Sequence, residues 1–359
     1  MSNGRPVLVS GVKPTGDLHI GNYFGAIRQQ VELVESGKYR PFIFVADYHA
    51  LNTMQDAEEM RRRTKELVMA YLAIGLDPKE VVLFKQSDVP AHTELCWIFD
   101  SITTMPYLML SHAFKATADR AFFENNNIKT TADLNNYFNS LPMTEADAGS
   151  DTFRSMVSRV FKGIGVGTFN YPMLMAADIL LYDAAVVPVG QDQKQHIEYA
   201  RDTAEKFNRI FKEDVFTLPE PYIMPDVAVV PGTDGQKMSK SYGNVIPLFG
   251  SRDKLAKAVM SIVTDSSGKR PENVYAIHKL VKSEKELEPL YKNNRGNYKA
   301  LKEALIEDLD RYFAPMRERY EALEKDPGAV EGILAEGKQE ARAVSEAKME
   351  RVRRAIGVA

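Results

Sequence analysis

The sequence predicts an α/β fold: a parallel sheet covered by helices, followed by an all-helical C-terminal part. In the first half, short β-branched runs alternate with long helical patterns, which is typical of a parallel sheet with helices on its faces. After Gly250 the strand pattern stops and only amphipathic helical patterns remain. The length of 359 residues, at roughly 150 residues per domain, also fits two domains.

Four buried strands make up the predicted sheet. Each is a short run rich in Val, Ile or Phe that is bounded by turn residues. The predicted strands are residues 6–10, 40–46, 81–84 and 186–189.

Helices are expected to connect these strands. Directly after a Gly- and Pro-rich loop at residues 11–17, apolar residues at helical spacing run from 20 to 35. Asp56, with Glu59 three residues later, is typical of the start of a helix, and Gly75 is suited to end it. The start of the chain therefore predicts one strand–helix–strand unit followed by a second helix.

Residues 118–167 interrupt this alternation. The segment is polar at first and helical from 151 to 161, without a strand pattern, so we interpret it as an insertion folded over one edge of the sheet. Beyond it, a Pro- and Gly-rich stretch at 219–244 precedes the C-terminal helices, which are expected at residues 254–262, 284–291, 298–319 and 330–355. The expected domains are residues 1–232 and 233–359, with a last helix, 340–359, that can pack back onto the first domain.

Composition excludes several classes of protein. Hydrophobic residues at 44% and charged residues at 26% are ordinary globular usage, so disorder, collagen and coiled coil are excluded. No apolar run approaches the ~20 residues that span a bilayer, and residues 1–6 show no secretory signal pattern. A single cysteine, Cys96, excludes an internal disulfide and a multi-cysteine metal cluster. We therefore expect a cytoplasmic protein without membrane contact, and its net charge of −3 means that any nucleic acid would need a local basic face.

Residues 11–23, GVKPTGDLHIGNY, join the first strand to the first helix. At this position an open parallel sheet presents helix-terminal N–H groups to an anion. Gly16 and Gly21 permit close approach of a nucleotide, and His19 and Asn22 share one face of the first helical turn, where both can donate hydrogen bonds to phosphate oxygens. The loop is neither a Walker loop nor the dinucleotide fingerprint, and a turn capped by Asp17, with a surface histidine, is the alternative.

A second basic loop lies far downstream. Residues 236–241, QKMSKS, stand between Gly235 and Gly243. Two lysines and two hydroxyls on such a loop are suited to close over a polyphosphate while charge moves to the leaving group. Taken alone, a solvated basic loop is the simpler interpretation.

Together the two segments resemble the signatures of class I aminoacyl-tRNA synthetases. HIGN at residues 19–22 resembles the HIGH motif, and residues 237–241 match KMSKS letter for letter. The resemblance narrows to the bacterial-type tryptophanyl-tRNA synthetases through SGVKPTGDLHIGNY at 10–23, YPMLMAADILLY at 171–182 and VPVGQDQKQH at 187–196. It implies a Rossmann-like nucleotide-binding domain, a helical tRNA anticodon-binding domain, a homodimer, and the activity of a tryptophan–tRNA ligase.

An indole ring has a flat apolar body and one N–H donor, so its pocket needs apolar walls and one acceptor. The sequence offers Met175, Val187 and Val189 as walls and Asp178 as the acceptor, the role that the resemblance implies for this aspartate. Without the resemblance, MAAD at 175–178 would be interpreted more simply as a core helix with an exposed aspartate. The resemblance also implies contacts of Tyr171 and Gln193 with the substrate ammonium, and of Gly190 and Asp192 with the ribose. The expected substrate-binding residues are Val9, Gly11, His49, Tyr171, Met175, Asp178, Val187, Val189 and Gln193.

The implied reaction has two steps. The tryptophan carboxylate attacks the α-phosphate of ATP and pyrophosphate leaves, and the 2′-OH of the terminal adenosine of tRNA(Trp) then attacks the adenylate. The carboxylate is already ionised at pH 7, so catalysis reduces to positioning and charge stabilisation. No protein metal site is expected, because Mg²⁺ rides on the nucleotide phosphates. The expected catalytic residues are His19, Asn22, Lys237 and Lys240, and the expected ATP-binding residues are Lys13, Thr15, Gly16, His19, Gly21, Asn22, Gly190, Asp192, Lys237, Met238, Ser239, Lys240 and Ser241.

Some features depart from the family pattern, and alternatives stay open. Lys13 stands where the family often has Gln, and the insertion replaces a loop whose lysine lies near ATP, a role for which Lys115 is a candidate. A tyrosyl-tRNA synthetase, a small nucleotidylyltransferase and a non-catalytic tRNA-binding paralogue are the alternative functions. Candidate contacts to the tRNA backbone, with solvated helix faces as the alternative, are Lys254, Lys257, Lys279, Arg295, Arg317 and Arg319.

Overall fold

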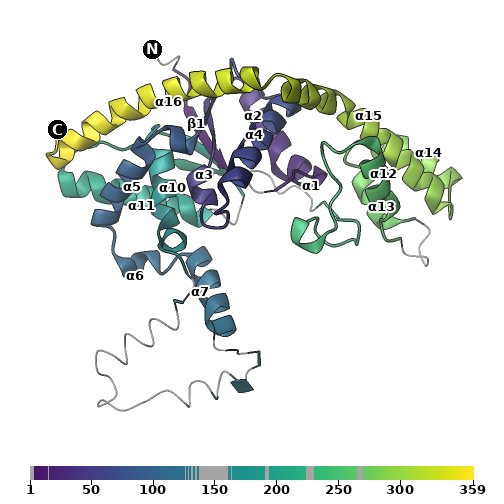
Figure 1. Ribbon diagram of the computed structural model, residues 1–359, viewed down its shortest axis with the longest axis horizontal. Helices are drawn as coiled ribbons and strands as arrows, with labels where there is room; N and C mark the ends of the chain where they lie inside the picture. The colour runs from purple at the N-terminus through teal and green to yellow at the C-terminus, as the bar shows by residue number, and fades with distance from the viewer. Residues whose placement is uncertain are drawn as a thin grey trace.

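The computed structural model describes residues 4–14, 16–125, 127, 129–130, 132–133, 136, 161–162, 164–190, 194–223, 230–264 and 270–359. Figure 1 shows a sheet surrounded by helices and, beside it, a helical part. α15 (Tyr298–Lys325) and α16 (Pro327–Ile356) form a long arc that spans both parts. α7 (His112–Asn125) extends away from the body.

A five-stranded, fully parallel sheet confirms the predicted fold class. Its order is β3-β2-β1-β4-β5, so the chain changes direction across the sheet between β1 and β4, the place where such sheets bind ligands. The predictions missed the edge strand β5, because Pro221 and the Pro- and Gly-rich surroundings resemble a linker; proline is tolerated at a sheet edge. The strands are β1 (Val7–Val12), β2 (Arg40–Val45), β3 (Val82–Lys85), β4 (Val186–Val189) and β5 (Glu220–Ile223).

Alternate residues of the strands face two hydrophobic clusters. In β1, Leu8 belongs to the cluster on one side of the sheet and Val9 to the cluster on the other. The first cluster continues without a break into the C-terminal helices, where it includes Leu255 and Leu305. The sheet and the helical part therefore share buried apolar contacts.

The predicted helix over 20–35 contains an irregular turn. It consists of α1 (Ile20–Asn22), a π-helical turn (Tyr23–Ile27) and α2 (Arg28–Glu35). Such π turns often occur at functional sites. This one packs Tyr23 and Phe24 against Phe313 of α15, with ring centroids 5.4 and 5.9 Å away.

The other helices of the sheet part agree with the local signals where those were clear. Asp56 caps the next helix by accepting the Glu59 N–H at 2.8 Å, and Gly75 ends it at φ 132°, as predicted. The expected insertion begins inside α7, and the helix expected at 151–161 lies, except for Phe161, outside the described residues. These helices are α3 (Asp47–Ala50), α4 (Ala57–Ile74), α5 (Ala91–Ile102), α6 (Met105–Leu108), α7, α10 (Val166–Leu180) and α11 (Lys194–Phe211).

From residue 252 onward, the regular elements of the described C-terminal part are helices. Its four predicted helices are present with slightly shifted ends, and α13 is an additional short helix that the predictions missed. Before α15 and α16, the helices are α12 (Arg252–Met260), α13 (Glu272–His278) and α14 (Glu284–Asn293).

The last helix, α16, returns to the sheet. Gly337 lies so close to β3 that a Cβ there would be 1.9 Å from the Leu83 carbonyl oxygen. Farther along the helix, the buried Lys348 ammonium donates to Asp183 at 2.6 Å and to the Val215 carbonyl at 2.9 Å. α16 therefore contacts the sheet part at several places along its length.

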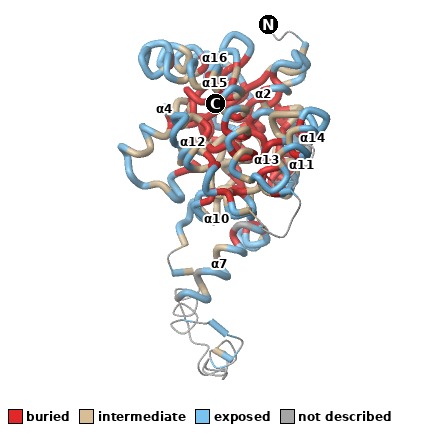
Figure 2. The backbone as a smooth tube through the Cα atoms, turned by 90° about the vertical axis from the view of Figure 1, so that its right-hand side faces the viewer, coloured by how far each residue is buried: buried red, intermediate tan, exposed pale blue. Residues whose placement is uncertain are grey.

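Buried residues gather in the body of the molecule, and Figure 2 shows mostly exposed residues along the extended α7. Among the described helices, none combines the length and the apolar character needed to cross a membrane.

Candidate active site

The loop between β1 and α1 ends in a reciprocal cap made by His19 and Asn22. The Asn22 N–H donates to His19 Nδ1 at 3.3 Å, and the His19 N–H donates to Asn22 Oδ1 at 3.2 Å. Burial and the nearby Lys240 lower the pKa of His19 to about 4, so its ring is neutral at pH 7. Because Nδ1 accepts, the ring proton is on Nε2. The atoms that can still donate to a phosphate are therefore His19 Nε2 and the Asn22 amide nitrogen. His19 is buried and caps the helix, so it is not a surface histidine.

The two signature loops meet in space. Ile20 N–H donates to the Ile246 carbonyl at 3.0 Å, and Leu248 N–H donates to the Leu18 carbonyl at 3.1 Å. Lys240 lies against Gly16, where a Cβ would be 2.8 Å from Nζ. Gly16 also has a φ of 65°, which favours glycine, so this position needs glycine for two reasons.

Asn244 braces the KMSKS loop and was missed by the sequence analysis. Its Oδ1 accepts the Ser239 N–H at 2.7 Å, and its Nδ2 donates to the Lys237 carbonyl at 3.1 Å and to Asp234 at 2.7 Å. Met238 is buried below the loop. Asn244 and Met238 therefore hold the backbone of the loop in place, and the lysine side chains extend from it.

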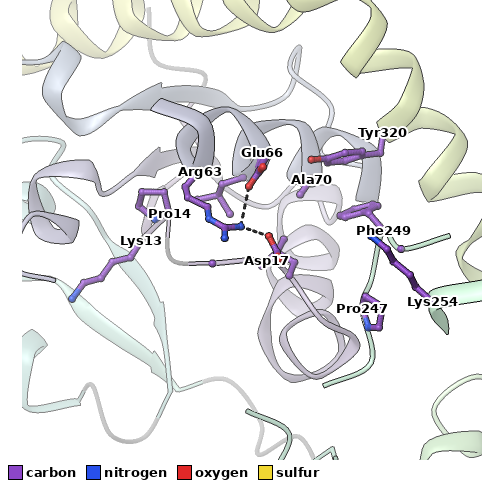
Figure 3. A pocket seen from close by; sticks show the side chains of 14 residues that line it. Lys13, Pro14, Asp17, Arg63, Glu66, Ala70, Pro247, Phe249, Lys254 and Tyr320 are labelled. Atoms are coloured by element: carbon purple, nitrogen blue, oxygen red, sulfur yellow. Dashed lines mark hydrogen bonds and ion pairs between the residues drawn. The ribbon is translucent and has the colours of Figure 1, made fainter. Parts of the chain in front are cut away.

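A cavity of about 280 Å³ lies beside the first loop, between that loop, α4 and α15. Figure 3 shows Arg63 of α4 bonded to Asp17 of the loop and to Glu66, the latter at 3.1 Å. Across the cavity, Phe249 stacks on Tyr320 with ring centroids 4.4 Å apart. The first loop is thus tied to α4 by an ion pair, and its Asp17 is an ion-pair partner, not the helix cap.

A second cavity, of about 310 Å³, opens at the point where β1 and β4 diverge. Gly11 lies against the Phe44 ring, where a Cβ would be 2.4 Å away, so glycine lets this ring line the cavity. Every described residue of the expected substrate-binding set lines this cavity, together with Lys13 and Gly190: Val9, Gly11, His49, Tyr171, Met175, Asp178, Val187 and Val189. Thr15, Asp192 and Gln193 lie outside the described residues.

Asp178 is a buried, ionised carboxylate at the wall of this second cavity. Its Oδ2 accepts from His49 Nε2 at 2.9 Å, and its Oδ1 accepts from His92 Nδ1 at 2.6 Å and from Gln86 Nε2 at 2.7 Å. Burial alone would raise the pKa of Asp178, but the hydrogen bonds from the two histidines outweigh burial and lower that pKa to about 2. The cavity therefore offers a fixed negative charge among apolar walls.

The sequence analysis missed three residues of this network: Gln86, His92 and Tyr182. Gln86 and His92 are completely buried, and His92 Nε2 lies 2.9 Å from the Tyr182 hydroxyl. The available signal was the polar run after the third strand, QSD at 86–88, because the carboxyl ends of parallel strands lie at the ligand-binding edge.

Tyr171 lines the second cavity and lies close to Lys13. The Tyr171 hydroxyl is 2.6 Å from His196 Nε2, and the Lys13 ammonium lies 5.9 Å from the Tyr171 ring centroid. Burial lowers the pKa of Lys13, and this residue lines both cavities. Lys115 is exposed on α7 and lines neither of them.

Three of the six candidate RNA contacts also have partners within the protein. Arg317 donates to Asp310 at 2.6 Å, Arg319 donates from Nε to the Ala73 carbonyl at 2.7 Å, and Lys279 donates to Glu284 at 3.3 Å. The exposed candidates are Lys254, Lys257, Lys279, Arg295 and Arg319. The RNA contacts of all six residues stay a prediction.

Comparisons with known proteins identify the family of the chain. The family model described as tRNA synthetases class I (W and Y) matches residues 1–132 and 124–323. The tryptophan–tRNA ligase of Fusobacterium nucleatum is 40% identical over 98% of this chain and 97% of that protein, and the one of Rhodopirellula baltica is 40% identical over 98% and 99%. A crystal structure of tryptophanyl-tRNA synthetase from Campylobacter jejuni complexed with ADP and tryptophan has a TM-score of 0.80 at 37% identity, covering 98% of this chain and 99% of that chain. The chain belongs to the class I tRNA synthetase family that comprises the tryptophan and tyrosine enzymes.

Proposed function

We propose that this chain is a tryptophan–tRNA ligase. The observation that carries the proposal is the buried, ionised Asp178 in an apolar cavity beside the two joined signature loops. An indole ring fits such walls, and its single N–H needs one acceptor. The named ligases at 40% identity, and the relative whose structure holds ADP and tryptophan, support the same assignment.

In the proposed first step, the second cavity holds tryptophan and the joined loops hold ATP. The indole N–H donates to Asp178 and the carboxylate reaches the α-phosphate near Gly190. His19 Nε2 and the Asn22 amide donate to phosphate oxygens, and Lys240 with Lys237 stabilises the departing pyrophosphate. No base is needed, because the attacking carboxylate is ionised at pH 7.

The remaining roles follow from position. Lys13, Thr15, Gly16 and Gly21 would contact the nucleotide phosphates, Asp192 the ribose, and Tyr171 and Gln193 the substrate ammonium. Among the described residues there is no cluster of three or more His, Cys, Asp or Glu side chains suited to a metal. Mg²⁺ bound to ATP would neutralise phosphate charge, and the protein contribution there would be the two lysines of the KMSKS loop.

The tRNA is proposed to bind across both parts of the chain. Residues 1–232 would form the catalytic domain and residues 233–359 the KMSKS loop with the anticodon-binding domain. Lys254, Lys257, Lys279 and Arg295 are exposed and would contact the RNA backbone. This charging reaction would take place in the cytoplasm.

A second copy of the chain is proposed to cover the face around α5. A cavity of about 190 Å³ there is lined by Asn52, Trp97 and Gly167, and Asn52 Nδ2 donates to the Gly167 carbonyl at 3.3 Å. Trp97 is 73% exposed, and Val166, next to Gly167 in the chain, is 79% exposed. Large apolar side chains gathered on one face are typical of a subunit contact, so we propose a homodimer.

An ATP–pyrophosphate exchange assay with each of the twenty amino acids tests the proposed function. We expect exchange with tryptophan and little with the others. Absence of exchange with tryptophan would sink the proposal, and preferential exchange with tyrosine would replace it by a tyrosine-specific enzyme. Charging of a tRNA(Trp) transcript then tests the second step and separates a ligase from a non-catalytic paralogue.

A further inference from the structure

The Asp178 network leaves one acceptor position for a ligand. An ionised carboxylate has about four acceptor positions, two on each oxygen. Gln86 and His92 occupy both positions on Oδ1, and His49 occupies one on Oδ2. The remaining position is on Oδ2, and Asp178 lines the second cavity.

The orientations of the donors His92 and Gln86 are themselves fixed by further contacts. His92 must donate from Nδ1, since an ionised carboxylate only accepts, and its Nε2 lies 2.9 Å from the Tyr182 hydroxyl. Tyr182 is held in turn by stacking on Phe42, with ring centroids 4.9 Å apart. The Gln86 oxygen accepts the His49 N–H at 3.4 Å, which turns the Gln86 nitrogen toward Asp178.

We propose that His92 and Gln86 are positioning residues for amino-acid specificity, because they saturate Oδ1 of Asp178 and leave a single acceptor on Oδ2 for the substrate N–H. The inference rests on the proposed function, since it takes the substrate to be an amino acid with one side-chain N–H donor. Neither residue touches the reacting atoms, and both act through Asp178.

Loss of the His92 donor changes the pKa of the carboxylate as well as its orientation. Burial opposes the charge of Asp178, and the hydrogen bonds from His49 and His92 keep its pKa low. Without His92, the pKa of Asp178 moves upward from about 2, but the loss of one hydrogen bond leaves the carboxylate ionised near neutral pH. A higher KM for tryptophan at neutral pH would therefore report the lost orientation of Asp178 and not its protonation.

The test compares His92→Leu with His92→Asn and with a matched control, His278→Leu. In the His92→Asn variant the new side-chain amide nitrogen reaches the place of the imidazole Nδ1, so the donor is retained. His278 is also completely buried, and it contacts the Asp308 carboxylate at 2.8 Å and the Tyr291 hydroxyl at 3.1 Å, but it lies in the helical part. The His278→Leu variant therefore measures how far the loss of a buried His–Asp–Tyr contact distant from the substrate changes the activity.

Pyrophosphate exchange is measured with tryptophan and with its benzothiophene isostere, which lacks the N–H donor. For His92→Leu we expect a KM for tryptophan roughly ten- to a hundredfold higher, the effect of losing a hydrogen bond to a charged group, with kcat changed little. The preference for tryptophan over the isostere should fall by a similar factor. His92→Asn should retain most of the preference, and His278→Leu should retain both the KM and the preference.

The outcomes separate the inference from the proposed function. A folded His92→Leu variant that keeps the wild-type preference would overturn the inference, as would an equal loss for both substrates. If His92→Leu does not fold, Gln86→Met carries the same expectations for the KM and for the preference between the two substrates. A wild-type enzyme without tryptophan exchange would instead contradict the proposed function.

Discussion

Lys240 lies where a single positive charge can act on both signature loops. Its side chain packs against Gly16 and its charge reaches His19. Burial lowers the pKa of Lys240, with Asp17 opposing that effect and Arg63 adding to it. At this position the Lys240 ammonium can stabilise the negative charge that develops on the phosphates in the transition state, but it does not contact the cavity proposed for tryptophan.

Lys240→Ala should therefore slow adenylate formation and leave tryptophan binding nearly unchanged. Loss of one group that stabilises a transition-state charge typically costs roughly 10²- to 10³-fold in rate. Single-turnover adenylate formation and equilibrium tryptophan binding measure the two effects separately. Lys299→Ala, on the exposed surface of α15, is the control and should change neither. Weaker tryptophan binding with normal adenylate formation would contradict the role assigned to Lys240.

His19 makes a second residue-scale prediction, about stability and pH. Its pKa is about 4 in the folded chain against an ordinary value of 6.5, because burial and Lys240 disfavour the charged ring. Between these values the unfolded chain binds a proton that the folded chain does not, so the His19 contribution to stability falls as the pH drops from about 6.5 toward 4. Above pH 6.5 it should be constant.

Chemical denaturation of the wild type and His19→Asn measures this effect. The asparagine can still cap α1 but does not titrate, so the stability difference between the two proteins should move in favour of the variant as the pH is lowered from about 7 to 5. The same difference at both pH values would mean that His19 titrates alike in the folded and unfolded chain.

At the scale of elements, short sequence patterns correctly predicted the helix ends that are set by contacts between residues close in sequence. The cap of Asp56 on Glu59 and the positive φ of Gly75 are contacts within a few residues, and both helix ends were predicted correctly. The π-helical turn at Tyr23 was not predictable, because it depends on packing against Phe313, nearly three hundred residues away in sequence. Tertiary contacts of this kind leave no periodic pattern.

Part of the candidate site could be predicted from short sequence patterns, and the rest could not. The two loops could be predicted because donors such as His19 and Lys240 on a glycine-rich loop are typical of phosphate binding. Asp178 looked like an exposed residue of a core helix without the family resemblance, and His92 gave no signal by itself. Their meaning lies in contacts between α3, α5 and α10 that only the fold brings together.

The contact of α16 with β3 gives an element-scale prediction. Gly337→Ala places a methyl group 1.9 Å from the Leu83 carbonyl oxygen, so the helix must shift away from the strand. We expect a loss of stability of roughly 1–3 kcal/mol or more, the usual cost of overpacking. Gly332→Ala on the same helix has nothing within 4 Å of its Cβ and should stabilise the protein by roughly 0.5–1 kcal/mol. Denaturant unfolding of both variants measures the contrast, and equal effects would show that α16 does not press on β3 in solution.

At the scale of the whole molecule, the long arc of α15 and α16 joins the two parts of the chain. α16 is fixed to the sheet part by Lys348 and by Arg353, which forms an ion pair with Glu94 of α5 at 2.7 Å. α15 packs on the first helix through Phe313 and on α12 through the shared cluster. The proposed tRNA contacts and the proposed catalytic loops are therefore connected by continuous packing. On the face around α5, the exposed apolar residue Trp97 is available for contact with a second subunit.

Trp97 gives the prediction that tests this assembly. It is the single tryptophan of the chain and is 73% exposed on α5. A carboxylate at this position would lose its hydration in an apolar contact, so Trp97→Glu should dissociate the homodimer into folded monomers. Met260→Glu, at a partly exposed apolar residue of α12 in the helical part, is the matched control and should remain dimeric. Sedimentation velocity measures the mass of each species. A dimeric Trp97→Glu protein would place the subunit contact elsewhere, whereas a monomeric wild type would remove the dimer from the proposal and leave the exposed α5 face without an occupant.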